Sequence, residues 1–309
     1  TTTLSGGAVF TLGSESAGTG DDNEELYMQY AYGLDMTSSF TGEDSLYVGM
    51  EAGNASGPLE SMDSATSTSG DAITLHSAFY SFPIGDLSVT GGPLLDQDDV
   101  VGATTSQYSD AFRLGSMPYS LAGGETGPGI GLTWSNDSGI VASASYVSDY
   151  GDDSSKGINT DDGSDVTTLT LGYDGDGFGG GLIIASNDGD GLDADGEAVN
   201  GYDTFGVGAY YSPESIDATV SVAYDTQDPE SGSDATDLFI GVDYEVGPGT
   251  LSVAWNSTEN DDSGDDTDST GFEVSYSYAI NDSVTITPGF YTVGETDGDE
   301  EDSGVVFET

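Results

Sequence analysis

The stretch DLFIGVDYEVGPGTLSVAWNST, residues 237–258, decides the fold of this chain because it joins two alternating segments by a turn. Apolar residues alternate with mostly small or polar ones from Leu238 to Val246, and again from Leu251 to Trp255. Gly247-Pro248-Gly249 between them is typical of a tight turn. Successive strand side chains point to opposite faces, so the pattern predicts a hairpin with one apolar and one polar face. The apolar face must contact either a second sheet or lipid.

The same alternation recurs along the chain and predicts sixteen strands in all. The fourteen others fall at residues 4–12, 26–36, 46–50, 73–82, 87–89, 130–134, 140–146, 169–173, 178–184, 205–211, 218–224, 272–278, 284–293 and 304–309. No apolar run reaches the ~18 to 20 residues that a transmembrane helix needs. The sequence therefore argues against membrane helices but leaves membrane strands open.

The connections between these segments fall into two sets that interleave strictly. The short set comprises residues 37–45, 83–86, 136–139, 174–177, 212–217, 247–249 and 281–283. The long, acidic set comprises residues 13–24, 53–71, 96–128, 148–165, 186–201, 225–234, 257–269 and 294–302. Outer-membrane barrels alternate short periplasmic turns with long external loops in this way. We therefore expect an all-β fold: a single domain over residues 1–309, forming a sixteen-stranded antiparallel up-and-down transmembrane β-barrel with both ends periplasmic.

Composition excludes several classes of function. The formal net charge is −55, because 57 acidic residues face only Lys156 and Arg113, so nucleic acid is excluded as a partner. The chain has no Cys and one histidine, His76, which rules out thiolate chemistry and His-pair zinc sites. With so many acids, a pair of carboxylates is no sign of catalysis, and we expect no enzyme. A hydrophobic content of 35% with 47 Gly suits strands that surround water rather than a thick core.

Aromatic residues gather at the ends of the expected strands. They are Phe82, Trp134, Tyr173, Phe178, Tyr211 and Tyr278 beside short turns, and Tyr146, Tyr224 and Trp255 toward long loops. This placement is typical of the aromatic girdles of a membrane barrel. Ordinary packing at strand ends is the alternative.

Several stretches resemble the cyanobacterial outer-membrane porins of the carbohydrate-selective porin family. They are SFTGEDSLYVGMEAGN (39–54), FYSFPIGDLSVTGGPLLDQDDVV (79–101), SDAFRLGSMPYSLAGGETGPGIG (109–131), TLGYDGDGFGGGLIIAS (170–186), SDATDLFIGVDYEVGPGTLSVAWNST (233–258) and VTITPGFYTV (284–293). The resemblance implies a barrel, usually a homotrimer, that passes small hydrophilic solutes such as sugars and inorganic nutrients. Membrane lipid and lipopolysaccharide are the implied surroundings.

The sequence departs from that family at both ends. Members of that family typically carry, before the barrel, an S-layer-homology domain that grips cell-wall polymers. We expect that domain to be absent here, so a cell-wall partner is expected only through it. The final segment, residues 304–309, is shorter than the ~9 to 11 residues of a spanning strand and lacks a terminal aromatic residue. We therefore expect the last few C-terminal residues to be absent or the last strand to be incomplete.

The longest connection, Asp96 to Pro128, corresponds to the loop that folds inward and narrows the pore in the porin plan. Its candidate constriction residues are Asp96, Asp98, Asp99, Tyr108, Asp110, Arg113, Tyr119 and Glu125. An acidic ring attracts cations, and Arg113 opposite it would create a transverse field; Arg113 pairing with Asp110 is the alternative. Tyr108, Phe112 and Tyr119 could stack on sugar or pack the loop to the wall. The acids expected to face the lumen along strands are Asp35, Asp243, Glu245 and Glu273.

Acid–glycine runs suggest weak Ca²⁺ or Mg²⁺ binding, at Asp174, Asp176, Asp188 and Asp190, with bridging to lipopolysaccharide phosphates. The calcium-loop spacing fails, because Leu192 and Ala198 occupy positions that require a ligand and a glycine. Solvated loops are the alternative, and no other cofactor is expected.

The main prediction is thus a cation-biased channel for passive diffusion. The alternative is a secreted, salt-adapted acidic β-sheet protein with a structural or binding role. Such a protein would be soluble without detergent in strong salt and would conduct no ions.

Overall fold

The computed structural model describes residues 1–16, 25–114, 125–160, 163–189, 201–261, 268–295 and 301–309. Its strands are β1 (Thr2–Ser16), β2 (Tyr27–Ser38), β3 (Ser45–Gly53), β4 (Thr74–Ile84), β5 (Leu87–Asp96), β6 (Thr126–Ser135), β7 (Ile140–Ser148), β8 (Asp165–Gly175), β9 (Phe178–Asn187), β10 (Tyr202–Tyr211), β11 (Ala218–Pro229), β12 (Ala235–Val246), β13 (Gly249–Asn260), β14 (Ser269–Asn281), β15 (Val284–Glu295) and β16 (Glu301–Glu308). Within these described ranges, three short 3₁₀ helices lie between strands: η1 (Pro58–Ser61), η2 (Ser69–Asp71) and η3 (Asp98–Val100). In the described part of the chain, no helix has the length and apolar character to cross a membrane.

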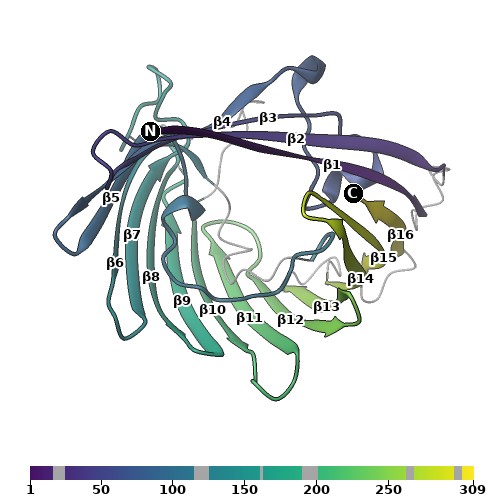
Figure 1. The fold of residues 1–309 in the computed structure, drawn as a ribbon. Coiled ribbons are helices and arrows are strands. Elements are labelled where there is room, and N and C mark those ends of the chain that lie inside the picture. Colours follow the sequence, from purple (N-terminus) through teal and green to yellow (C-terminus); the bar gives the residue numbers. More distant parts are fainter. Residues whose placement is uncertain (17–24, 115–124, 161–162, 190–200, 262–267, 296–300) are drawn as a thin grey trace.

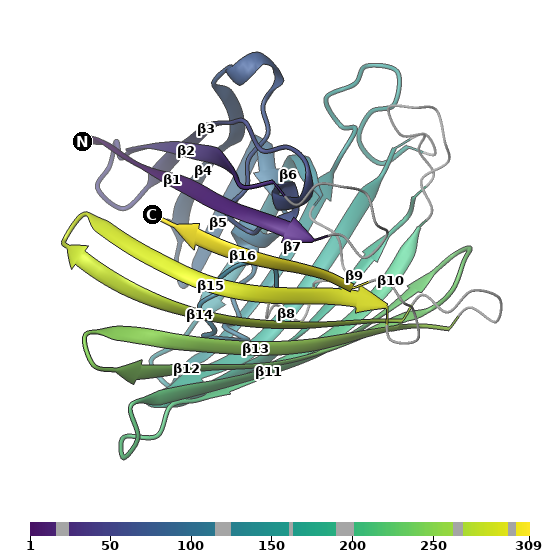
Figure 2. The ribbon, with the colours of Figure 1, turned by 90° about the vertical axis from the view of Figure 1, so that its right-hand side faces the viewer.

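The strands form one closed sheet (Figure 1). Each pairs antiparallel with its neighbours in sequence, and β16 closes the ring by pairing with both β15 and β1. Figure 2 places the N-terminus at the end of the barrel that carries the short turns. The expected sixteen-stranded up-and-down barrel is confirmed. A two-layer sandwich is excluded, because all strands belong to a single sheet.

The hairpin of β12 and β13 shows how the sequence produces this wall. Val246 pairs with Gly249 and Val242 with Val253, so the apolar positions of the two strands share one face. Gly247 in the turn has φ +64, a conformation that favours glycine. Ile240 is 41% exposed on the outer face, whereas Phe239 beside it is 1% exposed on the inner face.

The polarity of the wall is the reverse of that in a soluble β-protein. Exposed apolar residues on the outer face include Leu132, Leu169, Leu171, Ile184, Phe205, Val207, Val220, Val222, Leu238 and Phe272. Buried polar residues on the inner face include Ser143, Thr168, Thr170, Thr204, Ser221, Ser252 and Ser275. Among the described residues no second layer covers the outer face. A continuous apolar surface of this kind is suited to contact with lipid.

Several acidic stretches that we expected to be loops continue the strands instead. The expected loop 225–234 shrinks to residues 230–234, because β11 extends to Pro229 and β12 begins at Ala235. The last strand runs from Glu301 to Glu308 rather than over residues 304–309. Beyond the apolar band neither face needs apolar residues, so the alternation ends while backbone pairing continues. Sequence periodicity therefore marks the apolar band rather than the strand ends.

Candidate functional site

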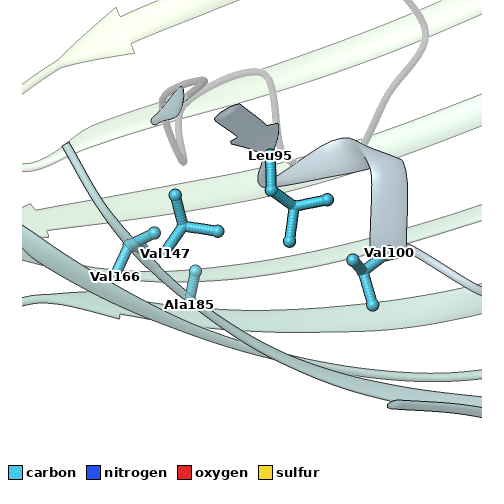
Figure 3. Packing of buried hydrophobic residues seen from close by; sticks show 5 residues of the cluster. All are labelled: Leu95, Val100, Val147, Val166 and Ala185. Carbon is cyan, nitrogen blue, oxygen red and sulfur yellow. The ribbon is translucent and has the colours of Figure 1, made fainter. Parts of the chain in front are cut away.

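The connection between β5 and β6 folds into the barrel, as expected. We call its described portion, residues 97–114, the inner loop. At its start, Leu95 and Val100 pack on Val147, Val166 and Ala185 from β7, β8 and β9 (Figure 3). These five residues form an apolar cluster on the inner wall. Burial of the cluster fixes where the inner loop leaves β5.

The inner loop then crosses the wall strand by strand (Figure 1). The Gly102 amide donates to Ser143 Oγ of β7 at 3.1 Å, and the Gln107 amide donates to Ser221 Oγ of β11 at 3.0 Å. Further on, Ser109 Oγ lies 2.8 Å from Ser252 Oγ of β13. Small hydroxyl residues on the wall therefore provide hydrogen-bond partners along the path of the inner loop.

Glycines on the inner face leave room for this path. The wall glycines beneath the inner loop are Gly131, Gly172, Gly181, Gly208, Gly241, Gly271 and Gly289. A Cβ at Gly241 would lie 2.6 Å from Tyr108 Cδ2, and a Cβ at Gly172 would lie 2.6 Å from Ala103 Cβ. Real side chains do not approach so closely, so only glycine allows the inner loop to lie flat on the wall. This packing explains part of the high glycine content.

Glu273 of β14 anchors the tip of the inner loop. Its Oε1 accepts a hydrogen bond from the Tyr108 hydroxyl at 2.7 Å, and its Oε2 accepts from the Arg113 and Leu114 amides at 2.9 and 3.1 Å. The side chain is 0% exposed. We expected this acid to face lumen water; it points inward but lies beneath the inner loop. A carboxylate with three donors is well compensated in such a buried place.

Arg113 is ion-paired with Glu15 of β1. Its Nη1 lies 3.0 Å from Glu15 Oε2, and its guanidinium lies over the Tyr291 ring at 5.1 Å from the centroid. The Tyr291 hydroxyl also donates to Glu15. The two charged side chains are 16% and 5% exposed, so the positive charge is largely neutralised at the wall. Sequence reasoning missed Glu15 because it placed residues 13–24 in a loop.

The aromatic residues of the inner loop pack against the wall. Tyr108 is 6% exposed and its ring lies 5.3 Å from that of Phe239, while Phe112 is 0% exposed. Of the two roles left open by the sequence, sugar stacking or packing, the structure shows packing for these two residues. Tyr119 lies outside the described residues.

The expected constriction acids lie at the start of the inner loop, near its tip and just before β6. Asp98 and Asp99 are exposed in η3, and the Asp96 amide donates to Asp99 Oδ2 at 3.0 Å. The pKa of Asp98 is raised to about 7, first because the surrounding protein partly desolvates its carboxyl. A hydrogen bond with Asp96 and the negative charges of Asp96 and Asp99 add to this shift. Partial desolvation by the surrounding protein also raises the pKa of Asp99, while the hydrogen bond from the Asp96 amide opposes that shift. Asp98 therefore changes its charge near neutral pH.

The other two expected constriction acids are Asp110 and Glu125. Asp110 has φ +42 near the tip of the inner loop. Glu125 lies just before β6, where its Oε1 accepts from Asn187 Nδ2 at 3.0 Å and from the Tyr202 hydroxyl at 3.3 Å. Burial raises the pKa of Glu125. Its side chain contacts β9 and β10, and its carbonyl accepts from the Gln97 amide at 3.0 Å, directly before η3.

The other three acids expected to line the lumen retain access to water. Asp35 of β2 accepts from the Tyr47 hydroxyl at 2.6 Å. Asp243 of β12 accepts from Ser109 Oγ at 2.8 Å and from Ser252 Oγ at 2.6 Å. Asp35 and Asp243 are half-buried, and Glu245 is exposed.

The acids proposed for divalent cations do not come together. Asp174 is near the short turn that follows β8, where Tyr210 donates to it, and Asp176 lies in that turn. Asp188 lies at the opposite end of β9, where its Oδ1 accepts from the Asp165 amide at 2.9 Å. Asp190 lies outside the described residues. In the parts of the chain that the structure describes, no three His, Asp or Glu residues form a group able to hold a metal.

A closed barrel with an apolar outer face, a polar inner face and an inward loop defines an outer-membrane β-barrel channel. The family model of the Gram-negative porins matches residues 1–305, and the chain belongs to this family. It is accordingly a protein of the bacterial outer membrane that forms a channel for passive diffusion.

Solved structures of porins and related outer-membrane proteins share the fold. OprB of Pseudomonas putida has a TM-score of 0.72 and 10% identity, covering 99% of this chain and 93% of that one. A loop L8 deletion mutant of OmpT, an outer membrane protein of Vibrio cholerae, has a TM-score of 0.66 and 14% identity, covering 99% and 98%. A mutant of the Rh. blastica porin has a TM-score of 0.58 and 14% identity, covering 99% of both chains. A search of curated proteins finds no significant match to the sequence.

Proposed function

We propose that the channel favours cations among the small hydrophilic solutes that it admits. The observation that carries this proposal is an imbalance of charge inside the barrel. Asp98, Asp99 and Glu245 are exposed, and Asp35 and Asp243 are half-buried. The single arginine of the chain is ion-paired with Glu15. Negative groups that line an aqueous passage lower the energy of a cation within it and raise that of an anion.

This proposal differs from the transverse field that the sequence suggested. A field across the pore needs a positive group opposite the acids, and the Arg113 guanidinium instead lies between Glu15 and Tyr291. Lys156 lies over the Tyr150 ring in the connection between β7 and β8, with its Nζ 3.4 Å from the ring centroid. Net negative charge, rather than a dipole, then governs selectivity.

The test is the reversal potential in a planar bilayer under a KCl gradient. The wild-type channel should give a potential of the sign expected for K⁺ preference. Replacing Asp98, Asp99 and Asp243 by asparagine should move it toward zero. The control replaces Asp137 and Asp282, two exposed acids in short turns, by asparagine and should leave it nearly unchanged. Anion preference in the wild type, or equal shifts in both variants, would contradict the proposal.

The resemblance to cyanobacterial carbohydrate-selective porins supports a finer proposal, that the channel also admits sugars. Its test is the swelling rate of liposomes containing the protein in isotonic mono- and disaccharides. Swelling with monosaccharides but not with larger sugars is expected; no swelling with any sugar would defeat this part while leaving ion conduction intact.

We further propose a homotrimer surrounded by lipid and lipopolysaccharide. One structure similar to this chain is described as a trimer form of Vibrio cholerae OmpT. Cross-linking in detergent should yield a trimer, and current should close in three equal steps.

A weak divalent contact between the acidic loops and lipopolysaccharide remains part of the proposal. Removing divalent cations with a chelator should then lower the thermal stability of the barrel in membranes that contain lipopolysaccharide. An unchanged midpoint of thermal unfolding after chelation would argue against the divalent contact.

A further inference from the structure

A second connection also folds inward. Residues 54–73, between β3 and β4, contain η1, in which Leu59 is 0% exposed, and Met62 just after it is 3% exposed. The Leu59 carbonyl accepts from Gln29 Nε2 of β2 at 2.8 Å, and its amide donates to the Tyr27 hydroxyl at 2.7 Å. A Cβ at Gly13 of β1 would lie 3.1 Å from Leu59 Cδ1. This connection, which we call the second loop, therefore lies on the inner wall of β1 and β2.

The second loop meets the tip of the inner loop. The Asp63 amide donates to the Phe112 carbonyl at 2.6 Å. Leu59, Met62 and Phe112 form one apolar cluster with Tyr291 of β15 and Val306 of β16. Two loops that start at different strands are thus joined by backbone and side-chain contacts.

Phe112 depends on the second loop for its burial. A Cβ at Gly289 of β15 would meet the Phe112 ring, so the wall covers one side of the ring. Leu59 and Met62 belong to the same cluster and contribute side chains from the second loop. Apolar side chains inside a water-filled barrel are stabilised when they remove one another's surface from water. Each loop therefore stabilises the inward position of the other.

We propose that the second loop is a constriction element that holds the tip of the inner loop and thereby sets the width and charge of the passage. Its acidic side chains support this role. Glu60 and Asp63 are exposed, while Leu59 and Met62 beside them are buried in the cluster. The second loop thus turns its apolar residues to the inner loop and its carboxylates to water at the junction.

The test uses Leu59→Ala, Phe112→Ala and the double variant, with Ser56→Ala, an exposed position in the same loop, as control. Both single variants should increase single-channel conductance and open-channel noise. Hydrogen exchange in peptides around Asp63 should accelerate by about tenfold or more, because each removes a buried contact of the loop junction. The double variant should add little to the larger single effect, since both substitutions remove side chains from the same apolar cluster.

A cross-link gives a second, independent measurement. The chain has no Cys, so Asp63→Cys combined with Ala111→Cys introduces a single thiol pair at the junction. A short bis-maleimide should join the pair in the folded protein and leave conductance close to the wild-type value. Heat-dependent migration on gels shows whether each variant has folded. Wild-type conductance in Leu59→Ala, Phe112→Ala and the double variant, additive effects of the two substitutions, or failure of the folded pair to cross-link would overturn the proposal.

Discussion

Replacing Glu273 by alanine removes the carboxylate that holds the tip of the inner loop on the barrel wall. The Tyr108 hydroxyl and the Arg113 and Leu114 amides, at 2.7, 2.9 and 3.1 Å, would lose their acceptor. Each buried donor left without an acceptor costs about 1–3 kcal/mol. Lumen water can hydrate some of these three donors, so we expect a total cost of about 3–5 kcal/mol for the docked loop. At about 1.4 kcal/mol per factor of ten, the ratio of undocked to docked loop should rise by about 10²- to 10⁴-fold.

Hydrogen exchange of residues 108–114, measured in folded protein in detergent, reports this ratio directly. Single-channel recording should show added open-channel noise as the loop moves in the passage. Glu245→Ala is the matched control, because it removes one carboxylate from a neighbouring part of the wall, β12, but Glu245 is exposed near the short turn. The reasoning fails if Glu273→Ala leaves exchange in residues 108–114 at the wild-type rate, or if Glu245→Ala accelerates it equally.

Three other predictions concern the wall, the outer face and pH. Gly241→Ala should displace the inner loop and change conductance, because the new Cβ would lie 2.6 Å from Tyr108 Cδ2. Gly33→Ala is the control and should leave conductance unchanged, because nothing lies within 4 Å of its Cβ. Equal conductance in the two variants would contradict the close fit of the inner loop on the wall. Ile240→Arg should destabilise the barrel in bilayers by about 2–4 kcal/mol, and Val246→Arg near the strand end by about 0–1 kcal/mol, as measured by urea unfolding; equal costs would argue against a lipid-facing band. Cation preference should fall as pH drops through about 7, because Asp98 becomes protonated and loses its negative charge, and Asp98→Asn should abolish this step in the reversal potential.

The sequence was sufficient for the architecture. Alternation from Leu238 to Val246 predicted which face of β12 is apolar, and the interleaving of short and long connections predicted the order of the strands. These features are local, because strand periodicity and turn composition depend on residues close in the chain. Strand ends were less accurate, since β11 and β12 continue past their apolar bands to Pro229 and from Ala235.

The site was less accessible to sequence reasoning because its contacts are distant in the chain. Arg113 meets Glu15 across 98 residues, and its amide meets Glu273 across 160. No periodicity in either segment specifies such a pairing. One local signal was present. Several strands hold glycine at inward-facing positions, as at Gly241, although a wall that faces only water has room for a side chain there. A glycine on the face that should line a passage indicates that another backbone lies on it.

The central claim is that the apolar outer face contacts hydrocarbon while the barrel surrounds an aqueous passage. The most direct measurement is the fluorescence of the two tryptophans, Trp134 and Trp255, in vesicles whose acyl chains carry bromine. Trp255 is 37% exposed on the outer face beside Ile240 of β12. The account predicts strong quenching by brominated chains and little quenching by iodide in the buffer. Strong iodide quenching with no response to bromine would show that this face does not lie in lipid.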